Sequence, residues 1–167
     1  MFGYDSIAQN KTIKIQKITG QEVQKKMLST DIYKKYSPAV FKILTDNGQG
    51  SGFFITPTLA VSNWHVFEGS SVEDILIKLA DGTVLYVDEV IEGSYDSDHV
   101  VFRVKNYRSK TLIPIELDIN TIQVGQTCYA IGSPLGYENT FSQGLISQTK
   151  LLKTKHIIQT NAPFDHG

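Results

Sequence analysis

The chain has 167 residues, of which 41% are hydrophobic and 20% are charged, with 16 basic against 17 acidic side chains. This length and composition predict a globular chain of one domain, or most of one. Because the charges nearly cancel, the sequence gives no basic face for nucleic acid or for an anionic membrane. No stretch approaches the ~20 apolar residues of a membrane-spanning helix, so we expect no membrane span.

Residues 1–35 are predicted to form an N-terminal arm with one or two short helices between residues 20 and 36. Thr19 is a candidate N-cap before a run of good helix formers. Residues 12–18 alternate between polar and apolar side chains and form either a lone strand or an arm; residues 1–12 are alternatively a linker-like leader. The start, MFGYDS, lacks the basic region and apolar core of a signal peptide, so the sequence gives no compartment.

From Ser37-Pro38 onward, β-branched and aromatic runs alternate with Gly, Asp, Asn and Ser. These runs are residues 40–44, 52–55, 59–62, 75–79, 84–87, 100–104, 127–131, 141–147 and 157–160. Asp81-Gly82 is a strong hairpin signal, because this pair supplies positive φ at low steric cost. Many short strands with regular turns predict an all-β barrel or sandwich.

Cysteine and histidine usage argues against a disulfide and against a metal site. Cys128 is the only cysteine, and its apolar surroundings predict a small buried hydrophobic residue, not a catalytic thiol. The four histidines and this cysteine show no metal-ligand spacing. We therefore expect no cofactor.

Two short segments carry the candidate chemistry. His65 follows an apolar strand in SNWHV, and Asp98 directly precedes another in DHVVF. A serine hydroxyl is a poor nucleophile until a neutral imidazole takes its proton. Histidine, then aspartate, then a later position is the chymotrypsin order of a serine-protease triad. Asp96 is the alternative acid, because it lies two residues earlier on the same face of an extended chain.

Residues 36–167 resemble trypsin-like proteases of the HtrA/Deg type through seven short motifs in the family's order. The motifs are a first strand at 36–40, a G-x-G-S-G-F turn at 48–53, the histidine segment at 59–69, an L-x-D-G hairpin at 79–83, the aspartate strand at 98–101, an A-I-G-x-P-x-G stretch within 124–136, and T-x-x-x-G-I-I-S at 140–147. The resemblance implies an all-β, chymotrypsin-like double β-barrel with its cleft between the barrels. The first barrel is expected at about 36–110 and an incomplete second barrel at about 111–167, after a short N-terminal helix.

The resemblance also implies roles for particular residues. His65 would be the general base, and Asp98, favoured over Asp96, would orient it. Gly167 matches the glycine two places before the nucleophile, so its N–H would be one oxyanion-hole donor. Pro163, Phe164 and His166 would border the substrate pocket, with Phe164 favouring small or medium aliphatic side chains; alternatively, Phe164 packs into the core.

The nucleophilic serine is expected beyond residue 167, so these 167 residues by themselves are expected to be inactive. Ser51 does not replace it, because GQGSG is not a G-x-S-x-G elbow. The predicted function is therefore a serine endopeptidase that acts on polypeptides; the alternative is a non-catalytic pseudoprotease or peptide-binding barrel. The loop at 45–48 is short for the family, so no cage-like assembly is implied, and an oligomer is possible but not indicated. The loop at 148–155 is also short, so the resemblance does not imply the activation relay that relatives have in this region. A cell-envelope location is common in the family.

Overall fold

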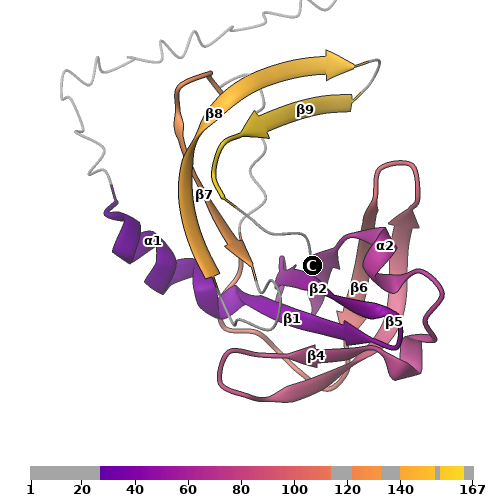
Figure 1. Cartoon of the computed structure of the whole chain (residues 1–167). Helices are drawn as coiled ribbons and strands as arrows, with labels where there is room; N and C mark the ends of the chain where they lie inside the picture. The colour runs from indigo at the N-terminus through magenta and orange to yellow at the C-terminus, as the bar shows by residue number, and fades with distance from the viewer. Residues whose placement is uncertain (1–26, 114–121, 133–139, 153–154, 164–167) are drawn as a thin grey trace, which may run out of the picture.

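The computed structural model describes residues 27–113, 122–132, 140–152 and 155–163. Within them a closed barrel is followed by a separate three-stranded sheet (Figure 1). The barrel strands are β1 Val40–Thr45, β2 Gly48–Phe54, β3 Leu59–Ser62, β4 Leu76–Lys78, β5 Val84–Ser94 and β6 His99–Val104. The second sheet contains β7 Thr127–Gly132, β8 Thr140–Leu152 and β9 Lys155–Thr160. The predicted mostly-β fold with an incomplete second barrel is confirmed.

The barrel closes in the order β1-β2-β3-β6-β5-β4, with antiparallel neighbours throughout. Alternation along the strands places one set of side chains inside, as β6 shows with Val100, Phe102 and Val104 buried. Phe41 packs against Phe54 and Phe102 with ring centroids 4.8 and 6.3 Å apart. This apolar interior fixes the strand register, because a slip of one residue would turn it toward water.

The hairpin predicted at residues 79–83 joins β4 to β5. Gly82 has a φ of +85°, and its N–H donates to the Leu79 carbonyl at 2.9 Å. Asp81 stays out of the left-handed region; its carboxylate instead accepts the Thr83 N–H at 2.9 Å. The hairpin prediction is confirmed, with glycine alone supplying the positive φ in this turn.

The expected turn at residues 48–53 is wrong, because these residues belong to strand β2. The glycines serve close packing instead. A Cβ at Gly50 would lie 2.5 Å from a methyl carbon of Val66, and one at Gly52 would lie 2.5 Å from the Phe41 ring. Glycine within a strand often marks such a close approach.

The expected loop at residues 148–155 is also wrong. Strand β8 continues to Leu152 and β9 begins at Lys155, with Gln148 paired to Gln159 and Leu152 to Lys155. The polar stretch remains a strand because the neighbouring strand satisfies its backbone hydrogen bonds. This sheet leaves several large apolar side chains exposed, as an incomplete barrel would: Leu145, Leu151, Leu152, Ile157 and Ile158.

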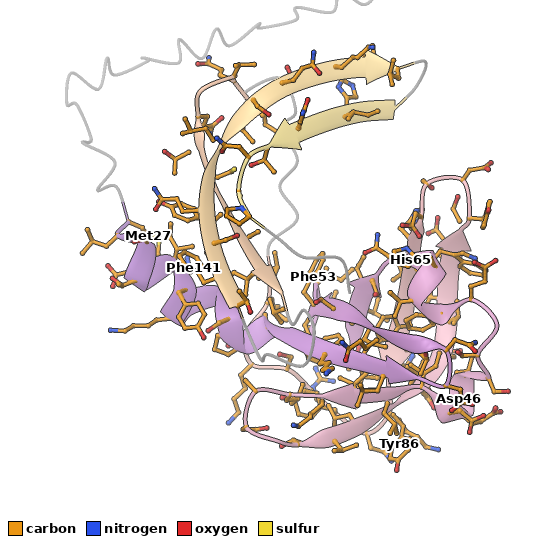
Figure 2. All side chains as sticks on the ribbon, viewed as in Figure 1. Met27, Asp46, Phe53, His65, Tyr86 and Phe141 are labelled. Carbon is orange, nitrogen blue, oxygen red and sulfur yellow. The ribbon has the colours of Figure 1, made fainter. Side chains whose placement is uncertain are left out.

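The N-terminal helix α1, Ser29–Tyr36, lies within the region where a helix was expected. Tyr33 makes an edge contact with Phe141 of β8, which stacks on Tyr129 of β7; the centroid distances are 5.5 and 5.4 Å. Figure 2 shows Phe141 beside this helix. The capping prediction at Thr19 falls outside the described residues. Among the described helices, none is long and apolar enough to cross a membrane.

Cys128 is less buried than predicted. It is half-buried in β7, and its Sγ lies 2.8 Å from the Thr160 hydroxyl oxygen of β9.

Candidate functional site

His65 is presented by a short helical turn at the end of β3. The chain leaves Ser62, passes through extended Asn63 and enters α2, Trp64–Phe67. Val66 and Phe67 are buried against the barrel, whereas the His65 side chain is 65% exposed. Burying one side of the turn therefore directs the imidazole outward (Figure 2).

Two contacts fix this turn on the barrel. The buried Ser62 hydroxyl donates to the Ser51 carbonyl at 2.8 Å and ties β3 to β2. Trp64 covers Gly93 of β5, where a Cβ would lie 2.5 Å from the indole ring. Strands β2, β3 and β5 thus position the candidate base.

Asp98 lies in the turn between β5 and β6. Its N–H donates to the Tyr95 carbonyl at 3.2 Å, and its φ is +48°. Aspartate enters this left-handed region more readily than most residues, and such conformations cluster at functional sites. The turn brings the carboxylate beside α2.

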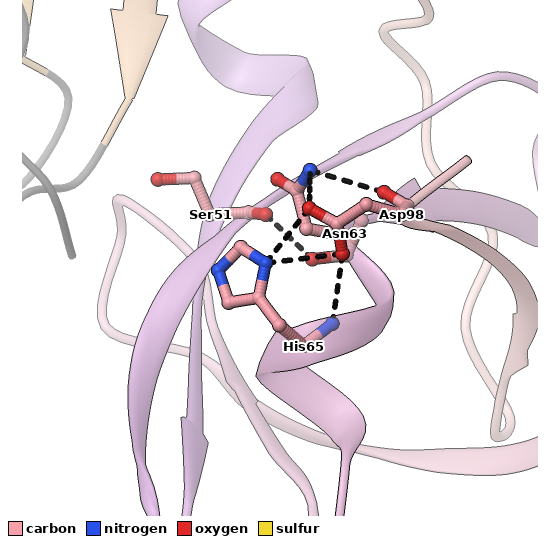
Figure 3. Close-up of polar contacts among 5 residues, drawn as sticks. Ser51, Asn63, His65 and Asp98 are labelled. Carbon is pink, nitrogen blue, oxygen red and sulfur yellow. Dashed lines mark hydrogen bonds and ion pairs between the residues drawn. The ribbon is translucent and has the colours of Figure 1, made fainter. Parts of the chain in front are cut away.

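The predicted contact between His65 and Asp98 is confirmed. The His65 Nδ1 atom lies 2.8 Å from Oδ2 and 3.0 Å from Oδ1 of Asp98 (Figure 3). The His65 backbone N–H also donates to Oδ1 at 3.0 Å. With Nδ1 directed at a carboxylate, Nε2 is the ring nitrogen left to act as a base.

Sequence analysis missed Asn63. Its side-chain Nδ2 donates to both the carbonyl oxygen and Oδ2 of Asp98, each at 3.1 Å. The only signal in the sequence was an amide residue two places before the histidine, which is also a common helix N-cap.

The Asp98 carboxylate stays ionised more readily than an ordinary aspartate. Desolvation is the largest single influence and would raise its pKa. The hydrogen bonds from the His65 backbone and ring, the His65 charge and the Asn63 amide together outweigh it and lower the pKa of Asp98. An ionised carboxylate is the form that holds an imidazole with its proton on Nδ1.

The other candidates take other places. His99 directs Nδ1 to the Ser97 hydroxyl at 2.9 Å, and its Nε2 lies 3.9 Å from Glu92. Ser51 points its hydroxyl away from the His65 ring (Figure 3). Its oxygen would lie 3.3 Å from a Cβ at Gly132. Among the described residues no group of three or more His, Cys, Asp or Glu side chains is arranged to hold a metal ion.

The predicted substrate-binding residues are described only in part. Pro163 is exposed and follows buried Ala162. The Asn161 side chain accepts the Leu145 N–H at 2.7 Å, which holds this segment against β8. Phe164, His166 and Gly167 lie outside the described residues.

A family model described as "Trypsin-like peptidase domain" matches residues 50–167. The chain is 32% identical over 130 residues to Protease Do-like 1, chloroplastic, of Arabidopsis thaliana, covering 72% of this chain and 29% of that protein. It is 32% identical over 125 residues to a probable periplasmic serine endoprotease DegP-like of Buchnera aphidicola subsp. Schizaphis graminum, covering 71% and 25%. The chain thus spans less than half the length of these curated relatives.

Solved structures give a similar result. An HtrA-type protease solved with a tripeptide superposes with a TM-score of 0.67 at 25% identity, covering 81% of this chain and 46% of that chain. The crystal structure of Deg5 gives a TM-score of 0.65 at 30% identity, covering 81% and 73%.

Proposed function

The chain belongs to the trypsin-like peptidases of the HtrA/Deg type, and from this premise we propose that it supplies the general base and the supporting acid of a serine endopeptidase. The main support is the 2.8 Å contact between His65 Nδ1 and the Asp98 carboxylate. The proposal assigns residues 36–167 to one protease domain, with the nucleophilic serine following residue 167. Its substrates are polypeptides.

In the proposed reaction His65 moves one proton twice in each half-cycle. Its Nε2 takes the proton of the serine hydroxyl as the serine oxygen bonds to the scissile carbonyl carbon. The resulting imidazolium, stabilised by Asp98, then gives this proton to the leaving amine nitrogen as the C–N bond breaks. In the second half, water bonds to the acyl carbon and gives one proton to His65 Nε2. The imidazolium then returns this proton to the serine oxygen as the acyl C–O bond breaks, which releases the carboxylic acid and the free serine.

In this proposal, residues 163–167 supply the groups that contact the substrate. The Gly167 N–H would donate to the oxyanion that develops on the scissile carbonyl. Pro163, Phe164 and His166 would border the pocket for the residue before the scissile bond, with Phe164 as an apolar wall. A small or medium aliphatic side chain fits such a wall best.

The test is His65→Ala in the protein that carries the serine. Losing the base should cost kcat on the order of 10⁶-fold, because the members of the triad act as a unit. The fold should survive, since His65 is exposed. The measurements are peptide cleavage and circular dichroism, and His99→Ala, with its different partners, is the matched control.

A second arm uses residues 1–167 alone with a fluorophosphonate probe, which should label nothing. Labelling that maps to Ser51 or Ser133 would place the nucleophile elsewhere and refute the assignment. If the folded protein with its complete tail cleaves neither aliphatic-rich peptides nor unfolded protein, the non-catalytic barrel becomes the better interpretation.

A further inference from the structure

Helix α2 is capped by Asp98 and not by Asn63, the residue at its N-cap position. Asn63 occupies the N-cap of α2, and asparagine is among the best N-cap residues. Its side chain nevertheless makes no capping hydrogen bond. Asp98 Oδ1 instead accepts the N–H of His65, the second residue of the helix, at 3.0 Å. The Asp98 carboxylate therefore caps α2 from the turn between β5 and β6, and the Asn63 amide is free to donate to another group.

That partner is Asp98 itself. A side-chain amide has two N–H donors, and those of Asn63 go to the Asp98 carbonyl oxygen and to Oδ2, both at 3.1 Å. One bond holds the backbone and the other holds the carboxylate. Together they restrain the two ends of a residue whose φ is +48°. Oδ2, the oxygen closest to His65 Nδ1 at 2.8 Å, is thereby fixed in direction.

Resting on the proposed function, we propose that Asn63 is a positioning residue of the peptidase, which holds Asp98 in the orientation that receives the Nδ1 proton of His65. Asn63 does not touch the substrate in this role; it acts through Asp98. A displacement of about 1 Å of a catalytic group from its productive position can lower the rate about 10²-fold.

Two substitutions separate this role from helix capping. Aspartate caps a helix as well as asparagine does, but an ionised aspartate has no N–H donor and adds a negative charge beside Asp98. A capping role would therefore tolerate Asn63→Asp and suffer from Asn63→Ala. A positioning role predicts the reverse order, with kcat about 10²-fold lower in Asn63→Ala, lower still in Asn63→Asp, and KM little changed in both.

Asn47→Ala is the matched control. The Asn47 amide also donates near α2, to the Glu68 carbonyl at 3.3 Å and toward the Ser70 hydroxyl oxygen at 3.4 Å, but these contacts lie at the opposite end of the helix from Asp98. This variant should keep the kcat and KM of the wild type. Thermal unfolding of each variant checks that the fold is retained.

Proton NMR of the same proteins reads the pair without catalysis. The Nδ1 proton of His65, identified by its absence in His65→Ala, should be observable in the wild type and in Asn47→Ala, and broadened or lost in Asn63→Ala. An unchanged Nδ1 proton in Asn63→Ala, or a fully active Asn63→Asp, would overturn the proposal. If the wild type cleaves no peptide, the proposed function fails, and the NMR result alone supports or refutes the positioning role.

Discussion

At the scale of single residues, the Asp98 carboxylate is hydrogen-bonded to the His65 backbone N–H, to the His65 ring nitrogen Nδ1 and to the Asn63 amide. Asp98→Asn should lower kcat about 10⁴-fold, because an amide stabilises the wrong imidazole tautomer. Asp96→Asn, in the same turn, is the matched control and should leave kcat near the wild-type value. Peptide cleavage measures both, and a larger loss in Asp96→Asn would transfer the role to that residue.

The lowered pKa of Asp98 also predicts a dependence of stability on pH. Because the pKa in the folded protein lies below the ordinary value of 3.8, the unfolded chain binds the proton more tightly. The stability contributed by this carboxylate is therefore fully present above pH 3.8, and it is lost as the pH falls through the lower pKa of the folded state.

Thermal unfolding of wild type and Asp98→Asn over this pH range measures the effect. The stability advantage of the wild type should shrink on acidification. A constant or growing advantage would show that the hydrogen bonds do not favour the ionised carboxylate.

At the scale of elements, α2 sits on β2 because Gly50 leaves room for Val66, the residue after His65. Gly50→Ala should destabilise the fold by about 1–3 kcal/mol through overpacking, and should lower kcat by displacing His65. Gly48→Ala in the same strand is the control, since a Cβ there meets nothing within 4 Å. Denaturant unfolding and peptide cleavage measure both variants; equal behaviour of the two would remove Gly50 from this role.

At the scale of the whole molecule, α1 packs against the second sheet through Tyr33, Phe141 and Tyr129. Its eight residues are too few for a stable isolated helix, so its order depends on this contact. Tyr33→Ala should lose about 0.5–1.5 kcal/mol of aromatic pairing in addition to buried area, whereas Tyr33→Phe keeps the ring. Amide hydrogen exchange in α1 should accelerate in the alanine variant only; equal exchange in both would show that the ring does not hold the helix.

The sequence alone determined much of the first barrel. Alternating apolar runs, such as the one that becomes β6, report which face is buried, because side chains on a strand point to opposite sides in turn. Asp81-Gly82 marked its hairpin for an equally local reason, the low steric cost of positive φ in glycine. The order of His65 and Asp98 identified the candidate pair from motifs that are each continuous in the chain. The roles of Phe164, His166 and Gly167 stay predictions.

Only the tertiary structure decided the rest, because the deciding contacts join distant segments. Asn63 and Asp98 are 35 positions apart, and no local pattern shows that the amide holds the acid while the acid caps the helix. The glycine-rich motif around Gly50 predicted a turn, but Gly50 lies in β2 and leaves room for the side chain of Val66. The family resemblance predicted a loop at residues 148–155, yet β9 supplies the backbone hydrogen bonds that keep residues 148–152 extended. Composition reports what a segment prefers alone, whereas pairing and close packing depend on which neighbour the fold brings to it.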